Sequence, residues 1–166
     1  MNPVWKFTNQ KELNKSQFIN YIERKVFKTI RKHSMLPKTK IITLKKSNDL
    51  NTQVLKKILE TKFQVKFSTK PNLASANLSQ ITEDIFKNIL KGDFNYQLST
   101  TNSPLLLVSD KELELYAKLN KIKGTKRKQN KKIQTLFQKF MNKNQDLELN
   151  ILKAFNQLPS LTHKNP

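Results

Sequence analysis

A short polar turn lies between an apolar run at 40–44 and an amphipathic segment at 51–61. Its residues are Lys45, Lys46, Ser47, Asn48 and Asp49. In many α/β proteins a strand, a turn and a helix in this order bind phosphate, because glycine N–H groups and the helix N-terminus face the anion. The two lysines could attract a phosphate, but without glycine the Cβ atoms obstruct a close approach of the N–H groups. The turn therefore predicts no preorganised phosphate site.

A second candidate for phosphate contact is the basic run at 118–132, which carries eight positive charges and no acid. Its basic residues are Lys118, Lys121, Lys123, Lys126, Arg127, Lys128, Lys131 and Lys132. The helix expected at 16–33 adds Arg24, Lys28, Arg31 and Lys32. We expect the run to be exposed around a flexible Gly124 and to contact RNA phosphates. It would position the RNA without reading its sequence, because lysine is a point charge.

The charge balance also favours a polyanionic partner. The chain has 32 Lys+Arg against 12 Asp+Glu, a net charge of +20. Such an excess repels itself in the free protein and favours RNA before membrane lipid. The alternative is a solvated face in a protein from an AT-rich genome, since only Arg24, Arg31 and Arg127 are arginines. That bias does not by itself suppress acidic residues, so we expect RNA binding.

Cysteine is absent, which excludes disulfides, thiolate nucleophiles and Cys-ligated zinc or iron–sulfur clusters. His33 and His163 are too few and too far apart in sequence for a histidine-based metal site. No metal or cofactor is therefore expected. The apolar run at 105–108 is too short to span a bilayer, and residues 1–15 lack a signal-peptide core. We expect a cytoplasmic protein, or one of an organelle matrix, without membrane contact.

The elements that must position these residues are mostly helices. Ser16 is the expected N-cap of the helix at 16–33, in which apolar residues recur every three to four positions. Strands are expected at 40–44, 63–68 and 104–108, and a loop at 93–103. Further helices are expected at 51–61, 77–92, 109–120, 129–142 and 146–157.

Two local signals support these helices. Gly92 suits the C-terminal end of the second of them, and Ser109 with Glu112 forms a capping box for the third. The order of the elements predicts an α/β fold with a small parallel sheet and a helix-rich C-terminal part. We expect an α/β domain over 1–122, a helical region over 123–158 and a flexible tail over 159–166.

Four segments, in chain order, are similar to motifs of one superfamily. They are ELNKSQFINYIERKVFKTIRKHSML (12–36), ASANLSQITEDIFKNILKGD (74–93), SPLLLVSDKELELYAKLNKI (103–122) and DLELNILKAFNQL (146–158). In these segments the chain resembles the PP-loop ATP pyrophosphatases, above all the tRNA 2-thiouridine synthetases of the archaeal and eukaryotic cytoplasmic type. The tRNA-isoleucine lysidine synthetases are the alternative, because the third segment also suits their motif and Glu83 fits a glutamate of theirs. The resemblance implies a reduced PP-loop sheet.

The chain departs from this superfamily where the resemblance places its chemistry. The turn at 45–49 aligns with the phosphate loop SGGKDS and keeps only Asp49. Asn14 and Gln17 stand at the positions of a cysteine and a histidine zinc ligand. Ser79 and Gln80 replace paired aspartates that the resemblance assigns to magnesium–ATP and substrate handling. The stretch between the helix at 51–61 and the second segment is also too short for the strands of a full enzyme.

These departures predict a non-catalytic tRNA- or RNA-binding derivative of a tRNA-uridine 2-thiolation enzyme. No catalytic residue is assigned, and RNA and an active paralogue are the expected partners. One alternative is a basic RNA-binding subunit of a ribonucleoprotein, such as a ribosome. Another is a tRNA-modifying ligase whose missing loop is supplied by a partner subunit.

Overall fold

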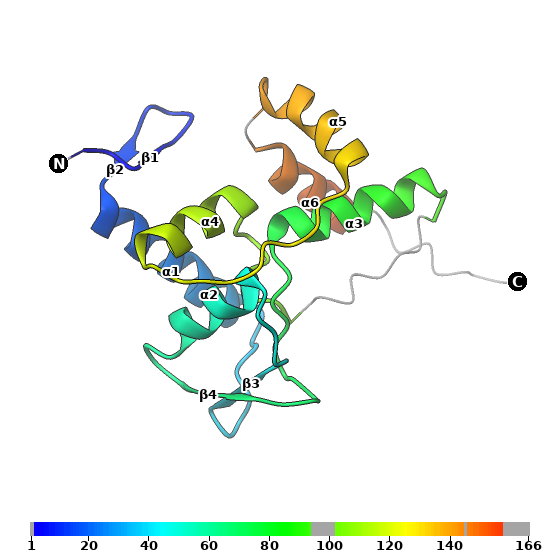
Figure 1. The fold of residues 1–166 in the computed structure, drawn as a ribbon. Coiled ribbons are helices and arrows are strands. Elements are labelled where there is room, and N and C mark those ends of the chain that lie inside the picture. The colour runs from blue at the N-terminus through cyan, green and yellow to red at the C-terminus, as the bar shows by residue number, and fades with distance from the viewer. Residues whose placement is uncertain (1, 94–101, 145, 158–166) are drawn as a thin grey trace, which may run out of the picture.

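The structure is a computed structural model that describes residues 2–93, 102–144 and 146–157. Helices dominate it, with one short hairpin and one small parallel sheet (Figure 1). The strands are β1 (Trp5–Lys6), β2 (Glu12–Leu13), β3 (Ile41–Leu44) and β4 (Gln64–Phe67). The helices are α1 (Lys15–Lys32), α2 (Leu50–Leu59), α3 (Leu78–Leu90), α4 (Asp110–Leu119), α5 (Lys131–Met141) and α6 (Leu147–Gln157). The predicted loop at 93–103 and tail at 159–166 fall largely or wholly outside the described residues.

The parallel sheet is formed by β3 and β4, which α2 connects in the expected strand–helix–strand order. The register pairs Ile41 with Gln64 and Leu44 with Phe67. The other edge of β3 is closed by Asn72, whose Nδ2 donates to the Ile41 carbonyl while its Oδ1 accepts the Thr43 N–H. The turn at 45–49 therefore leaves the sheet at the carboxyl end of β3 and leads directly into α2.

The prediction of a third strand at 104–108 was wrong. This segment forms successive turns, in which the Leu106 N–H donates to the Ser103 carbonyl and the Val108 N–H donates to the Leu105 carbonyl. Leu105 and Val108 belong to the larger hydrophobic core, whereas Leu106 packs against the smaller one. Because neighbouring residues of this segment enter different cores, the chain must turn between them. It therefore cannot present one continuous face to a sheet.

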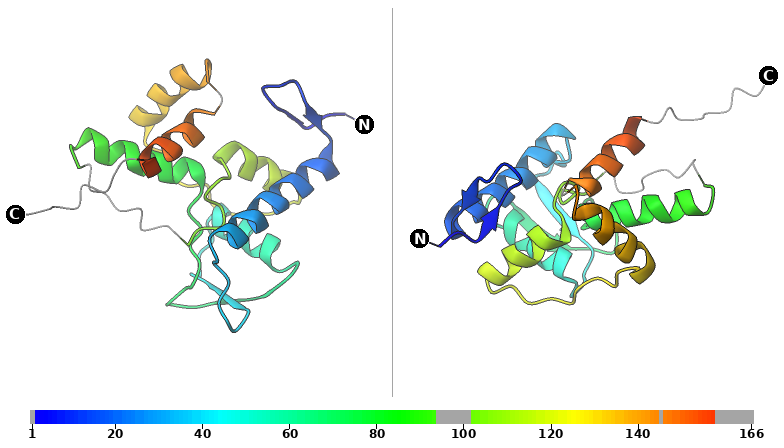
Figure 2. Two further views of the ribbon diagram at one scale, coloured as in Figure 1. Left: turned by 180° about the vertical axis from the view of Figure 1, so that it is seen from behind. Right: turned by 90° about the horizontal axis from the view of Figure 1, so that it is seen from above.

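Two hydrophobic cores hold the helices together. The larger lies between α1, α2, α4 and the inner face of β3, and Phe18, Ile22, Val26 and Ile30 supply its α1 side. The smaller joins α3 to α6, and α5 covers α3 through a T-shaped contact between Phe86 and Phe137. Figure 2 shows α3, α5 and α6 gathered at one side of the molecule, away from α1. The predicted division after residue 122 stays a prediction.

Helix caps explain where the helices begin. Asn14, and not the predicted Ser16, is the N-cap of α1: its Oδ1 accepts the Gln17 N–H at 3.0 Å, and the Gln17 side chain accepts the Asn14 N–H. Asn14 caps in place of Ser16 because its extended backbone precedes the first helical turn. The capping box of Ser109 and Glu112 at α4 is confirmed.

Candidate functional site

The turn at 45–49 retains one residue with a defined task. Asp49 is the N-cap of α2, since its Oδ1 accepts the Thr52 N–H at 2.9 Å and its carbonyl accepts the Gln53 N–H at 3.1 Å. Lys45 and Lys46 are exposed and lie on the strand side of the turn. The acid that survives from the resembling motif therefore serves the helix itself, and its carboxylate takes the place at the helix start where an anion would bind.

The same helix start is covered by the segment that joins α4 to α5. We call residues 121–130 the strap, which crosses the start of α2 in an extended path (Figure 1). The Leu50 N–H donates to the Thr125 carbonyl at 2.9 Å, and the Thr125 N–H donates to the Asn48 carbonyl at 2.8 Å. Together with the Thr52 N–H bound by the Asp49 carboxylate, two of the first three N–H groups of α2 are therefore engaged by acceptors that precede the helix or lie in the strap.

Gly124 makes this close crossing possible. A Cβ at this position would lie 2.8 Å from the Leu50 Cα and 3.0 Å from the Leu50 N. Both atoms belong to the helix backbone, which cannot yield as a flexible side chain would. Gly124 was expected to give flexibility to an exposed run; instead it allows two backbones to pass in contact.

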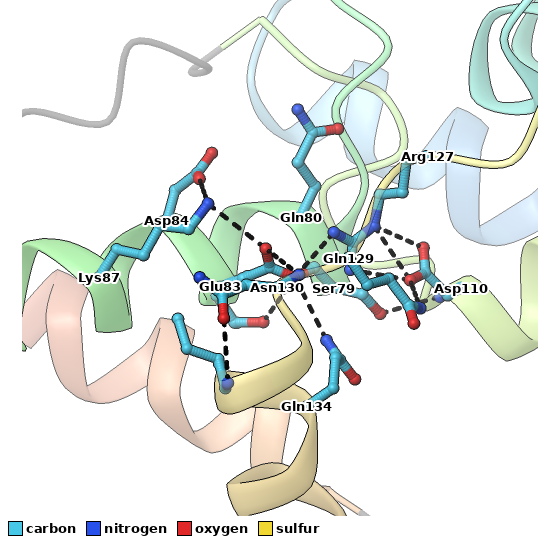
Figure 3. Close-up of polar contacts among 12 residues, drawn as sticks. Ser79, Gln80, Glu83, Asp84, Lys87, Asp110, Arg127, Gln129, Asn130 and Gln134 are labelled. Carbon is cyan, nitrogen blue, oxygen red and sulfur yellow. Dashed lines mark hydrogen bonds and ion pairs between the residues drawn. The ribbon is translucent and has the colours of Figure 1, made fainter.

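Arg127 fixes the strap to α3 and α4 (Figure 3). Its Nη1 donates to Glu83 Oε2 at 2.9 Å, and its Nε donates to Asp110 Oδ2 at 3.0 Å. Nη2 also lies 2.8 Å from Asp110 Oδ2, as an ion pair that is not aligned for a hydrogen bond. The side chain of Arg127 is 14% exposed, that of Asp110 16% and that of Glu83 3%. The guanidinium thus bridges two carboxylates from α3 and α4, and Lys87 Nζ is a second cation 3.4 Å from Glu83 Oε1.

The two carboxylates are held in their charged form. Burial alone would raise the pKa of Glu83, but hydrogen bonds from Arg127 and from the Asn130 N–H hold it below its ordinary value. Burial also opposes the charge of Asp110, and hydrogen bonds from Arg127 and Asn77 likewise hold its pKa below the ordinary value. The cluster is an ion network in which Arg127 of the strap and Lys87 of α3 are the cations.

Ser79 and Gln80 stand where the resembling family has paired aspartates, and Ser79 serves packing. Ser79 is buried; its Oγ donates to Glu148 Oε2 at 3.0 Å and accepts the Asp110 N–H at 2.9 Å. Gln80 points away from the ion network (Figure 3). Burial, together with the negative charge of Asp110, raises the pKa of Glu148 above its ordinary value, although the Ser79 hydrogen bond opposes the shift. These residues join α3, α4 and α6 and leave no pair of carboxylates facing a ligand.

The basic residues named in the sequence divide into two kinds. Seven lysines of the run at 118–132 are exposed, as are Arg24, Lys28, Arg31 and Lys32 on α1. Arg127 is the exception, and the expectation that the whole run is exposed was wrong for it, because two carboxylates hold it inside. A substitution of Arg127 would therefore change the stability of the fold as well as the charge of the run. Its position as the one arginine among lysines was the signal, since arginine suits buried bidentate pairing.

Four of the exposed lysines surround a groove between α4 and the strap. The groove has a volume of about 610 Å³ and continues along Leu50 into a smaller hollow of about 190 Å³ beside Arg127. Its basic lining residues are Lys111, Lys118, Lys123 and Lys126. Sequence reasoning missed Lys111, which lies two helical turns before Lys118 on α4 and outside the basic run.

In the part of the chain that the structure describes, no group of three or more His, Cys, Asp or Glu side chains could hold a metal ion. In the same residues, no helix is both long enough and apolar enough to cross a bilayer.

The comparisons with known proteins concern the fold. No protein-family profile and no curated protein sequence matches the chain. Its fold is similar to that of the U34-tRNA thiolase NcsA from Methanococcus maripaludis, solved with its 4Fe-4S cluster, with a TM-score of 0.73. The similarity covers 94% of this chain and 84% of that chain, at 13% sequence identity. The chain has a PP-loop-like α/β fold.

The PP-loop-like fold agrees with the resemblance seen in the four sequence segments. At 13% identity the likeness to the thiolase is one of fold. The residues of this chain do not fit the cluster of that structure, because no cysteine is present to provide a thiolate ligand.

Proposed function

We propose that this protein is a non-catalytic RNA-binding protein derived from a tRNA-uridine 2-thiolation enzyme. The observation that carries the proposal is the strap over the start of α2. In a PP-loop-like fold, the turn between β3 and α2 is where the resemblance places the ATP phosphates. Here the Thr125 carbonyl and the Asp49 carboxylate accept the helix N–H groups that a phosphate would need.

The charge distribution supports the RNA part of the proposal. Many acidic side chains are used inside the fold: Asp49 and Glu112 cap helices, Glu83 and Asp110 hold Arg127, and Glu148 accepts from Ser79. Ion pairs within the fold engage Lys6, Lys25, Lys56, Lys87, Lys126 and Arg127. Most basic residues of the described part of the chain are exposed, and a polyanion would bind to them with release of counterions.

The test measures RNA binding and ATP binding on the same purified protein. Fluorescence anisotropy with labelled tRNA should show binding whose affinity falls steeply with salt. If about five phosphates are contacted, the slope of log affinity against log salt is roughly −3.5 to −4.5. Calorimetric titration with magnesium and ATP should show no stoichiometric site.

Three results would contradict the proposal. A stoichiometric, micromolar ATP site would show that the strap leaves the phosphate position accessible. ATP-dependent release of pyrophosphate in the presence of tRNA, alone or with a partner subunit, would establish a ligase instead. Absence of tRNA binding at low salt would remove the RNA-binding role.

A further inference from the structure

The groove between α4 and the strap has two basic rims and an apolar floor. Lys111 and Lys118 stand on the α4 rim, seven residues and about 10 Å apart along the helix. Lys123 and Lys126 stand on the strap rim. We propose that this groove binds one strand of RNA, with lysines of both rims on its phosphates and the floor beneath its sugars and bases. The proposal deepens the proposed function and rests on it.

The arrangement of the rims favours a single strand over a duplex. One phosphodiester chain that passes between the rims is within reach of lysines from both sides. A duplex holds its two backbones in a fixed geometry, whereas a single strand can adapt its path to the lysines of both rims. Positively charged grooves that follow one backbone are the usual form of sequence-tolerant single-strand binding.

The floor sets the expected character of binding. It is lined by Leu50, Leu115, Ala117 and Ile122, and no aromatic residue is among the residues that line the groove. Aliphatic side chains can cover the faces of sugars and bases but do not stack on bases as aromatic rings do. Binding should therefore depend strongly on salt and weakly on base identity.

One acid in the groove provides a sharper test than the lysines. Glu114 lies on α4 between the two rim lysines, and its Oε2 accepts from Lys126 Nζ at 2.6 Å. The pair is exposed, so it contributes little to stability. If RNA occupies the groove, Glu114 repels the phosphates and holds Lys126 away from them. Glu114→Gln should then strengthen RNA binding, an effect that a structural role of Glu114 does not predict.

The first experiment compares two charge-matched triple variants by anisotropy with labelled oligouridylate. The groove variant carries Lys111→Gln, Lys118→Gln and Lys123→Gln. The control variant carries Lys38→Gln, Lys66→Gln and Lys70→Gln, which are exposed lysines of β4 and of loops that flank the sheet. If three phosphate contacts are lost, affinity should fall about 50-fold at about 0.15 M salt, and the salt slope should flatten by about two units. The control should lose less than about 5-fold.

The second experiment uses single acid-to-amide substitutions. Glu114→Gln should raise affinity for oligouridylate by about 4-fold at about 0.15 M salt, the effect of one gained phosphate contact. Glu60→Gln is the matched control, because Glu60 forms an exposed ion pair with Lys56 on α2 and does not line the groove. It should change affinity by less than about 2-fold.

The third experiment places a probe in the groove without removing several charges. Because the chain has no cysteine, a single introduced cysteine can carry a photo-crosslinker. A probe at Lys118→Cys should crosslink to oligouridylate and lose the crosslink when unlabelled single strand is added, but not when an equal amount of blunt duplex is added. A probe at Lys66→Cys should give little crosslinking.

The outcomes separate the groove from the general function. If the wild-type protein binds RNA but the groove and control triple variants bind equally, the proposal that RNA binds in the groove is wrong, while the proposed RNA-binding function stands. The groove is also overturned if Glu114→Gln weakens binding, or if duplex competes as well as single strand. If the wild-type protein binds no RNA at low salt, the proposed function fails, and the groove fails with it.

Discussion

The strap uses its positive charges in two opposite ways on its two sides. On the inner side, the largely buried Arg127 lies between Glu83 and Asp110, and these carboxylates balance its charge. On the outer side, Lys123 and its neighbouring lysines are exposed around a groove. The difference teaches that a run of basic residues is not one functional unit. The inner arginine should govern stability, and the outer lysines should govern binding to a polyanion.

The largest effect should come from removal of the inner charge. Arg127→Gln leaves the largely buried Asp110 without a cation and Glu83 with only the partly exposed Lys87, and we expect the free energy of unfolding to fall by about 3 kcal/mol. Lys128→Gln, at the exposed neighbouring position, should change it by less than about 0.5 kcal/mol. Urea denaturation followed by circular dichroism measures both. Equal stability of the two variants would show that the inner and outer sides do not differ.

The pH dependence of stability should sharpen the same contrast. The pKa values of Glu83 and Asp110 are held below their ordinary values in the folded protein. Their contribution is therefore complete above the unfolded-state values of about 4 and is lost as pH falls through the folded-state values. The stability difference between wild type and Arg127→Gln should shrink from about 3 kcal/mol at neutral pH to about 1 kcal/mol near pH 3. A constant difference would assign the loss to packing.

A substitution at the tightest point of the strap should have a smaller effect. Gly124→Ala places a Cβ against the backbone of Leu50, and we expect a loss of about 1–2 kcal/mol in unfolding free energy. Gly92 provides a control. A Cβ there would meet no atom within 4 Å, so a substitution is disfavoured only by the backbone conformation, whose φ is +75°. Asparagine tolerates that φ, so Gly92→Asn should be milder than Gly124→Asn. The reverse order would contradict the close crossing.

A substitution of Glu148 should have the smallest effect on the free energy of unfolding, and it should stabilise the protein. Glu148 is a buried acid that the strap does not neutralise, and its folded-state pKa is raised. Stability should therefore decrease as pH rises from the unfolded-state value of about 4.3 through the folded-state value. Glu148→Gln can still accept from Ser79, so this variant should gain of the order of 1 kcal/mol over wild type at pH 8. At pH 4 the gain should vanish; a loss at pH 8 would mean that the charged form is needed.

Regular signals in the sequence predicted the helices and the parallel pair of strands. The periodic apolar residues of α1, the cap formed by Ser109 with Glu112, and Gly92 after α3 each act through neighbours in the chain. Local interactions of this kind can be recognised from sequence because they involve residues a few positions apart.

The errors arose where distant partners decide the structure. The apolar run 105–108 was read as a strand because a short run cannot show that its residues serve two cores. The hairpin of β1 and β2 has two residues in each strand, too few for an alternating pattern. The inward position of Arg127 depends on Glu83 and Asp110, which are 44 and 17 residues away. The candidate site differs most from its prediction, because the strap, which is distant in the sequence, covers the turn.

The capping box of α1 has a consequence for how the protein tolerates its surroundings. The amide side chains of Asn14 and Gln17 stand where the resembling family has metal ligands, and they bind the backbone of α1 and each other's N–H groups. Amides neither lose their hydrogen bonds to a chelator nor react with mild oxidants. The hydrogen bonds at the start of α1 should therefore persist with EDTA and after exposure to peroxide, which hydrogen exchange of the Asn14 and Gln17 N–H groups would measure.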